Sequence, residues 1–239
     1  MAVYADDTAV FCQVPWKNLK KAKKILVAAL ESVKKFLSTW KIQLNKNKTE
    51  FIILTKSSVM IRRMDEDILN FDGSTFKWAN EVKYLGIILD RKLNFRKHIE
   101  TCLTKVKSLS FSTLYCLLKN GSRVNKKEKT IIYKTIIRPI MTYGCPIFNN
   151  CAKSHRKKLH VIENKILRMA LNIKWDDFVT NNEVHERSMT PTLEEFCNKL
   201  TENFFNRCQD NENPLISTIG NYEKSSLEFR LKHRLPKKL

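Results

Sequence analysis

The sequence has little glycine, few acidic residues and no long apolar segment. Only 5 of its 239 residues are glycine while 43% are hydrophobic, which is typical of a folded globular chain and not of a low-complexity or disordered one. Its apolar runs stay well short of the roughly 20 residues that a membrane-spanning helix needs, and it opens without a leader of the signal type. We therefore expect an intracellular protein without a membrane partner, built as one large or two small domains.

The shortage of acidic residues leaves 24 Asp and Glu against 44 Lys and Arg, a formal net charge of +20. The basic excess is spread along the whole chain. Nucleic acid is the commonest polyanion that so basic a protein binds, and a membrane surface is the competing interpretation. The composition thus favours a nucleic-acid partner.

The seven cysteines are odd in number and scattered, so we expect reduced thiols and not a disulfide framework. One grouping has the residue types of a metal site: Cys145, Cys151, His155 and His160. Only three residues separate Cys151 from His155, which leaves no room for the hairpin and helix of a zinc finger. The spacing therefore disfavours zinc.

The first twelve residues, MAVYADDTAVFC, place two aspartates between apolar β-forming runs. This pattern predicts a strand, a tight turn and a strand, with Asp6 and Asp7 at the tip. A polar turn is the ordinary interpretation of such a pair. The alternative is a metal site, because polymerases use carboxylates to hold two Mg²⁺ ions about 3.5–4 Å apart.

The next segment predicts a helix followed by strands. Apolar residues at steps of three and four indicate an amphipathic helix over 17–40, with lysines on its solvated face. Residues 41–54 then predict a short strand, an Asn/Lys loop and a buried strand. Lys48 lies in that loop, and its simplest interpretation is a turn lysine beside a strand.

Two further features precede the helical part of the chain. Asp72-Gly73 between apolar runs predicts a β-hairpin. Residues 82–90 predict a single buried strand in which Gly86 marks a bulge or a close approach of backbone.

From residue 96 onward the apolar spacing is helical. We predict a helix over 154–171, and another that opens with a capping box at Thr192 to Glu195. The pair Asp176-Asp177 is predicted to lie in a loop, and residues 230–239 to form a basic tail. Two more apolar stripes are predicted. The first comprises Ile99, Leu103, Val106, Leu109, Leu114 and Leu117. The second begins with Ile131, Ile132, Ile136 and Ile137 and is interrupted at Pro139 and Gly144.

Three short motifs occur in an order and spacing that resemble one family. They are Tyr4-Ala5-Asp6-Asp7 followed by Thr-Ala-Val-Phe, the pattern Ile-x-Leu-Asn-x-x-Lys-Thr-Glu over residues 42–50, and Tyr84-Leu85-Gly86. The segments 137–144 and 157–168 share the likeness. Together they resemble the reverse transcriptases of jockey-type non-LTR retrotransposons.

The resemblance implies an α+β fold: an incomplete polymerase palm of hairpin, helix and strands over 1–95, a helical thumb over 96–172, and C-terminal helices with a basic tail over 173–239. It implies that Asp6 and Asp7 bind Mg²⁺ and that Lys48 assists the leaving pyrophosphate. The resemblance also implies that Tyr4, Tyr84, Leu85 and Gly86 contact the primer and the template. The implied partners are an RNA template, a DNA primer and dNTP, and the implied location of the intact element is the nucleus.

Members of this family carry another catalytic aspartate and a fingers region upstream of the Tyr-Ala-Asp-Asp motif. We therefore expect this chain to be a polymerase fragment with negligible activity alone. One alternative is a non-catalytic nucleic-acid-binding remnant or a reused basic helical module. Another, which sets the family aside, is a basic α+β scaffold with a helical interaction bundle.

Overall fold

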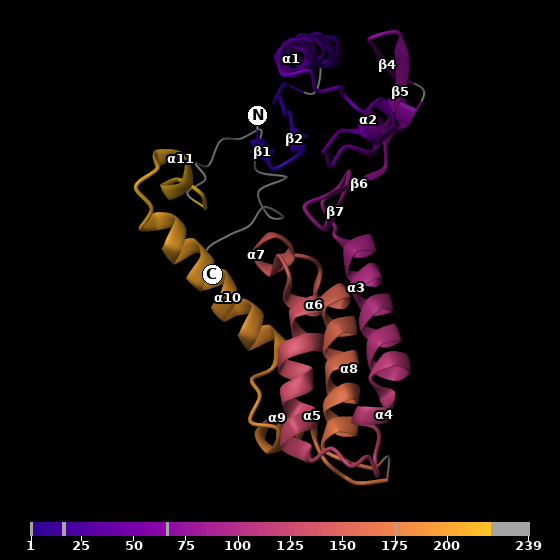
Figure 1. Ribbon diagram of the computed structural model, residues 1–239, viewed down its shortest axis with the longest axis vertical. Helices are drawn as coiled ribbons and strands as arrows, with labels where there is room; N and C mark the ends of the chain where they lie inside the picture. The colour runs from indigo at the N-terminus through magenta and orange to yellow at the C-terminus, as the bar shows by residue number, and fades with distance from the viewer. Residues whose placement is uncertain (1, 16–17, 66, 175, 221–239) are drawn as a thin grey trace. The chain divides into compact units, whose positions relative to one another are not determined.

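The computed structural model describes residues 2–15, 18–65, 67–174 and 176–220. The chain divides into two compact units, Met1–Lys92 and Leu93–Leu239 (Figure 1). The predicted basic tail over 230–239 lies outside the described residues.

The first unit combines short strands with one long helix. β1 pairs with β2 in an antiparallel hairpin, and β6 pairs with β7 in another. The third sheet has the order β3-β5-β4, with β3 parallel and β4 antiparallel to β5. The elements are β1 (Ala2–Tyr4), β2 (Asp7–Ala9), α1 (Leu19–Thr39), the 3₁₀ helix η1 (Lys46–Lys48), β3 (Phe51–Ile52), α2 (Ser58–Asp65), β4 (Ile68–Phe71), β5 (Ser74–Ala79), β6 (Glu81–Tyr84) and β7 (Ile87–Asp90).

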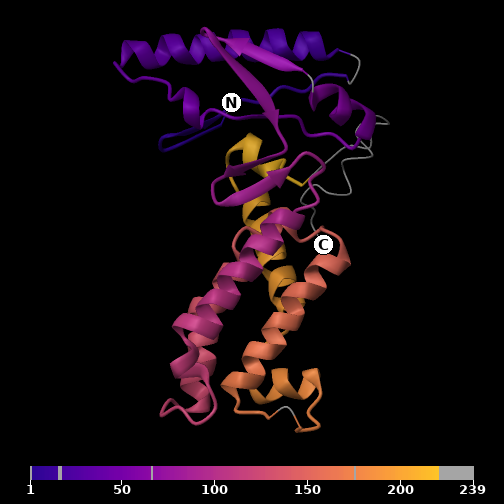
Figure 2. The same cartoon turned by 90° about the vertical axis from the view of Figure 1, so that its right-hand side faces the viewer.

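The core of this unit lies between α1 and the β3-β5-β4 sheet (Figure 2). Leu30 of α1 joins a buried cluster with Phe51 of β3 and Trp78 of β5, whose rings meet edge to face at 6.1 Å. The predicted amphipathic helix is thus confirmed as α1. The apolar stripe of this helix is not buried along its whole length. Near its end, Phe36 and Trp40 remain 62% and 65% exposed.

The prediction of a short strand just after this helix is wrong. The amide of Ile42 donates to the carbonyl of Leu37, and the amide of Lys41 donates to that of Ser38. With Lys41 at a φ of 57°, this is a Schellman end to α1. The backbone groups that a strand would need are therefore engaged in terminating the helix.

Among the described residues of the second unit, every regular secondary-structure element is a helix. Helices α3, α6 and α8 lie side by side (Figure 1). The helix predicted over 154–171 is confirmed as α8. The elements are α3 (Arg96–Ser108), the π-helix η2 (Leu109–Thr113), α4 (Tyr115–Leu118), α5 (Lys126–Ile132), the π-helix η3 (Tyr133–Ile137), α6 (Arg138–Thr142), α7 (Cys145–Phe148), α8 (Lys153–Ala170), α9 (Asn181–Arg187), α10 (Leu193–Gln209) and α11 (Pro214–Ser217).

The buried stripe of the α5-η3-α6 segment differs from the prediction. Tyr133, Ile137 and Met141 are fully buried, whereas Ile131 is 57% exposed and Ile136 44% exposed. The π-helical turn in this segment changes which positions face inward. Pro139 does not interrupt the segment as predicted, because it lies at the start of α6, where its missing amide donor is tolerated.

Three helices of the second unit begin with capping boxes. The predicted box of Thr192 and Glu195 at α10 is confirmed. The boxes at α5 (Asn125 and Glu128) and α9 (Thr180 and Glu183) were not predicted. Across the described residues, no helix is long and apolar enough to cross a membrane.

Candidate functional site

The two aspartates of the first motif lie at the tip of the β1-β2 hairpin. The register pairs Tyr4 with Asp7, so that Ala5 and Asp6 form a two-residue turn. Ala5 adopts a φ of 51°, which alanine rarely adopts and which lets the chain reverse within two residues. Asp6 thus sits in the turn and Asp7 opens β2. The predicted strand, turn and strand are confirmed.

The hairpin exposes its acidic tip to solvent. Asp6 and Asp7 are both exposed, and Tyr4 retains 66% of its accessible surface. Carboxylate oxygens are the donors that Mg²⁺ prefers, and such a site is commonly built from one or two carboxylates with waters and substrate phosphates. Within the described part of the chain, no group of three or more His, Cys, Asp or Glu side chains could enclose a metal. The pair therefore suits part of a Mg²⁺ ligand set, not a complete one.

Lys48 lies at the end of η1, in a loop that is closed by local hydrogen bonds. The side chain of Asn45 accepts from the amide of Asn47 at 3.1 Å, and the hydroxyl of Thr49 donates to the carbonyl of Asn45 at 2.9 Å. These bonds close the loop locally. The side chain of Lys48 is left exposed.

Asp72 fastens this loop to its surroundings. Its carboxylate accepts from Lys34 of α1 at 2.5 Å and lies 2.9 Å from the ammonium of Lys46, which also donates to the Asp72 carbonyl at 2.6 Å. Hydrogen bonds from the two lysines hold the pKa of Asp72 below its usual range. The loop that carries Lys48 is thereby tied to α1 and to the β4-β5 turn.

The motif Tyr84-Leu85-Gly86 corrects the prediction of a single strand over 82–90. Tyr84 ends β6, and Leu85 and Gly86 form a two-residue turn into β7 with φ values of 45° and 82°. Positive φ at both positions is the signature of a type I′ hairpin turn. A continuous apolar run hides such a reversal, because leucine gives no turn signal.

Arg91 anchors that hairpin, a role that no sequence pattern predicted. Its side chain is 5% exposed, and its guanidinium donates to the carbonyl of Ala79 at 2.8 Å and to that of Trp78 at 2.6 Å. A buried arginine that pairs with backbone carbonyls joins the end of β7 to β5. Arg91 therefore holds the hairpin that carries the Leu85 turn against β5.

No direct polar contact joins the catalytic-type aspartates to the lysine motif among the described residues. Within the described residues, no hydrogen bond or ion pair joins Asp6 or Asp7 to Lys48. All three side chains are exposed. Each of the three motifs of the first unit is therefore held in place by its own neighbouring residues.

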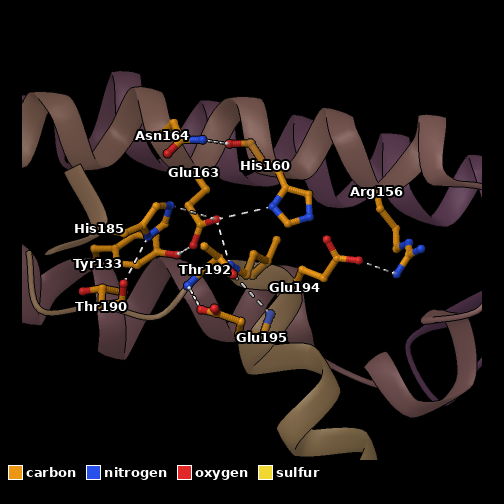
Figure 3. Close-up of polar contacts among 11 residues, drawn as sticks. Tyr133, Arg156, His160, Glu163, Asn164, His185, Thr190, Thr192, Glu194 and Glu195 are labelled. Carbon is orange, nitrogen blue, oxygen red and sulfur yellow. Dashed lines mark hydrogen bonds and ion pairs between the residues drawn. The ribbon is translucent and has the colours of Figure 1, made fainter. Parts of the chain in front are cut away.

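A different carboxylate, Glu163, is the centre of a buried polar network in the second unit (Figure 3). It accepts from the hydroxyl of Tyr133 at 2.6 Å and from the amide of Leu193 at 3.0 Å. The rings of His160 and His185 approach the same carboxylate to 3.8 and 4.0 Å. Glu163 thus connects α8 with η3, α9 and the start of α10.

Burial governs the ionisation of this network. Burial raises the pKa of Glu163, although hydrogen bonds from Tyr133 and from the amide of Leu193 oppose the shift. Burial and the neighbouring carboxylate also raise the pKa of Tyr133. Because Glu163 and Tyr133 are fully buried, the network cannot meet a substrate, and we assign it a structural role. One sequence signal could have revealed it: Glu163 follows Ile162 on the inward side of a helical stripe.

Comparisons with known proteins bear on the first unit most directly. Residues 1–89 match the model of the family described as "Reverse transcriptase (RNA-dependent DNA polymerase)". This segment contains the Asp6-Asp7 hairpin, Lys48 and the Leu85-Gly86 turn. Residues 1–89 are therefore similar to reverse transcriptases.

Similarity to curated proteins extends beyond that segment. The chain is 29% identical to "Probable RNA-directed DNA polymerase from transposon X-element" of Drosophila melanogaster, over 84% of this chain and 21% of that protein. It is 26% identical to "RNA-directed DNA polymerase from mobile element jockey" of the same species, over 92% of this chain and 23% of that protein. The predicted resemblance to the jockey-type non-LTR group is thus confirmed.

The chain spans about a fifth of the length of these curated relatives. No solved structure matches it significantly.

Proposed function

We propose that this chain supplies the catalytic-motif part of an RNA-directed DNA polymerase of a non-LTR retrotransposon. In this proposal residues 1–95 form part of the palm, 96–172 the thumb and 173–239 the C-terminal helices. The observation that carries it is the tight hairpin that presents Asp6 and Asp7 within the segment matching the reverse transcriptase family. The nuclear location is likewise a prediction for the intact element.

The proposed roles follow from the chemistry of nucleotide transfer. Asp6 and Asp7 would hold Mg²⁺, which when bound activates the primer hydroxyl and neutralises the charge of the transferring phosphate. The exposed ammonium of Lys48 would stabilise the leaving pyrophosphate. Tyr4 and the turn of Tyr84, Leu85 and Gly86 would contact primer and template, the turn being held by Arg91.

We further propose that the 239-residue polypeptide incorporates little or no nucleotide by itself. Phosphoryl transfer depends on positioning and on charge neutralisation by several groups at once. Asp6 and Asp7 provide two carboxylates, and the chain spans about a fifth of its relatives. Template-dependent incorporation of dNTP by the purified polypeptide with Mg²⁺ would contradict this part of the proposal.

Metal binding at the hairpin can be tested apart from activity. Thermal unfolding would be followed with and without millimolar Mg²⁺ or Mn²⁺ in the wild type and in the double variant Asp6→Asn, Asp7→Asn. The second aspartate pair, Asp176 and Asp177, provides a matched control as Asp176→Asn, Asp177→Asn. We expect a metal-dependent rise in melting temperature that only the hairpin variant loses. Equal responses in all three proteins would refute the assignment.

A second candidate function is nucleic-acid binding without catalysis. The net charge of +20 and the exposed lysines of α8 favour it. Its test is the affinity for an RNA·DNA duplex as a function of salt. Binding that weakens steeply with salt and ignores sequence would support it, and no retention at low salt would exclude it.

A further inference from the structure

A groove of about 760 Å³ runs between α3 and α8 of the helical unit. Apolar residues of its lining, among them Leu103, Phe111 and Val161, are called the floor here, and its lysines, among them Lys107 and Lys165, are called the rim. We call this feature the α3–α8 groove. No role assigned above uses its apolar floor.

Val161 is the most informative residue of the floor. It retains 60% of its accessible surface on a helix whose other apolar residues are mostly buried. Lys157 and Lys165 stand four residues to either side, so that the three side chains form one row along α8. Val161 therefore places an apolar side chain between two lysines on the exposed face of α8.

Most lysines of the rim lack a carboxylate partner among the described residues. Lys158 lies 3.8 Å from the carboxylate of Glu100. Among the described residues, no carboxylate is in ion-pair contact with Lys107 or Lys157, and Lys165 instead stands over the ring of Phe111 at 5.0 Å. The groove thus combines the exposed apolar side chain of Val161 with lysines of which only Lys158 lies near a carboxylate.

We propose that the α3–α8 groove binds an acidic amphipathic helix of a partner protein. Apolar side chains on one face of that helix would contact Val161 and Leu103, and flanking Asp or Glu residues would meet the lysines on both walls. The row from Lys157 to Lys165 is about 12 Å long, which matches rather more than two helical turns.

Two other occupants fit the groove less well. A phosphodiester chain offers the lysines its charge but has no aliphatic groups to contact Val161. A second copy of this chain is disfavoured, because its net charge of +20 would bring like charges together.

The test uses the whole 239-residue protein and a labelled peptide of about four helical turns, with leucines on one face and glutamates beside them. Fluorescence anisotropy would measure its binding at low and moderate salt. A scrambled peptide of the same composition and a single-stranded oligonucleotide of equal charge would be measured in parallel. We expect the amphipathic peptide to bind at least tenfold more tightly than the scrambled one.

Two variants separate the floor from the charge. Val161→Asn removes the apolar contact without changing charge and should weaken peptide binding about tenfold, while leaving oligonucleotide binding unchanged. Val59→Asn is its matched control, since Val59 is a helical valine of the other unit that is 54% exposed. Lys157→Gln with Lys165→Gln should weaken peptide binding and reduce its dependence on salt.

Three outcomes would overturn the proposal. The scrambled peptide could bind as tightly as the amphipathic one, or Val161→Asn could behave like Val59→Asn. Alternatively, the lysine variant could weaken only the oligonucleotide while the peptide fails to bind, which would make the groove a nucleic-acid surface. The proposal stands independently of any polymerase activity.

Discussion

Glu163 and the pair Asp6-Asp7 are carboxylates in opposite surroundings. Glu163 is fully buried and receives hydrogen bonds from Tyr133 and from the amide of Leu193. The two aspartates are exposed at the tip of a two-residue turn. The carboxylate of Glu163 therefore accepts its hydrogen bonds from groups within the fold, whereas the carboxylates of Asp6 and Asp7 are accessible to a ligand.

This difference separates a residue that stabilises the fold from residues that are proposed to bind a ligand. A buried acceptor whose partners lie in four elements contributes to the free energy of unfolding, because its loss leaves donors unsatisfied. An exposed carboxylate contributes little to stability and can coordinate a cation without disturbing the fold. All three side chains are carboxylates, so burial and hydrogen-bond partners are what distinguish their expected roles.

The largest effect is expected for Glu163→Ala. The variant leaves the hydroxyl of Tyr133 and the amide of Leu193 buried without an acceptor, so it should lower the free energy of unfolding by about 3 kcal/mol. Urea unfolding followed by circular dichroism would measure it. Glu194→Ala, which removes an exposed carboxylate 3.3 Å from Arg156, is the control and should cost less than about 1 kcal/mol. Equal losses in the two variants would contradict the structural role of Glu163.

The pH dependence of stability sharpens the same point. Burial raises the pKa of Glu163 in the folded state above its ordinary value. The stability linked to this group is therefore fully present below the pKa of the unfolded chain and is lost as pH rises through the folded pKa. Unfolding measured at several pH values should show the wild type losing stability relative to Glu163→Gln as pH rises above the ordinary glutamate pKa. A difference that is constant with pH would contradict the raised pKa.

Backbone conformation in the exposed hairpins gives an effect of intermediate size. Leu85 adopts a φ of 45°, which suits glycine and strains leucine. Leu85→Gly should therefore raise the free energy of unfolding by up to about 1 kcal/mol. Asp72→Gly relieves a similar φ of 52° but removes the carboxylate that Lys34 and Lys46 contact, so it should gain less or lose stability. A loss in Leu85→Gly would show that the leucine side chain outweighs the strain.

The sequence predicted those parts of the fold whose signals are local. Periodic apolar spacing identified α1 and α8, Asp72-Gly73 identified a hairpin turn, and Thr192 with Glu195 identified the start of α10. The Asp6-Asp7 hairpin followed from short apolar runs around two turn-forming residues. Each of these patterns acts within a few residues along the chain.

The missed features depend on contacts that are distant in sequence or on conformations that residue type disfavours. The turn at Leu85 requires a positive φ from leucine, and the Schellman end at Lys41 replaces an expected strand. Arg91 and Glu163 acquire their roles only when remote backbone groups surround them. The roles of Lys48 and Tyr84 at a polymerase site rest on the family resemblance and stay predictions.

The smallest effect is expected for Asp6→Asn with Asp7→Asn in the absence of divalent metal. Both side chains are exposed, and amides can occupy the same turn, so the free energy of unfolding should change by less than about 0.5 kcal/mol. Urea unfolding in the presence of a chelator would measure this. A loss above about 1 kcal/mol would mean that the carboxylates stabilise the hairpin itself, and the contrast with Glu163 would fail. A negligible change leaves ligand binding as the role that their exposure permits.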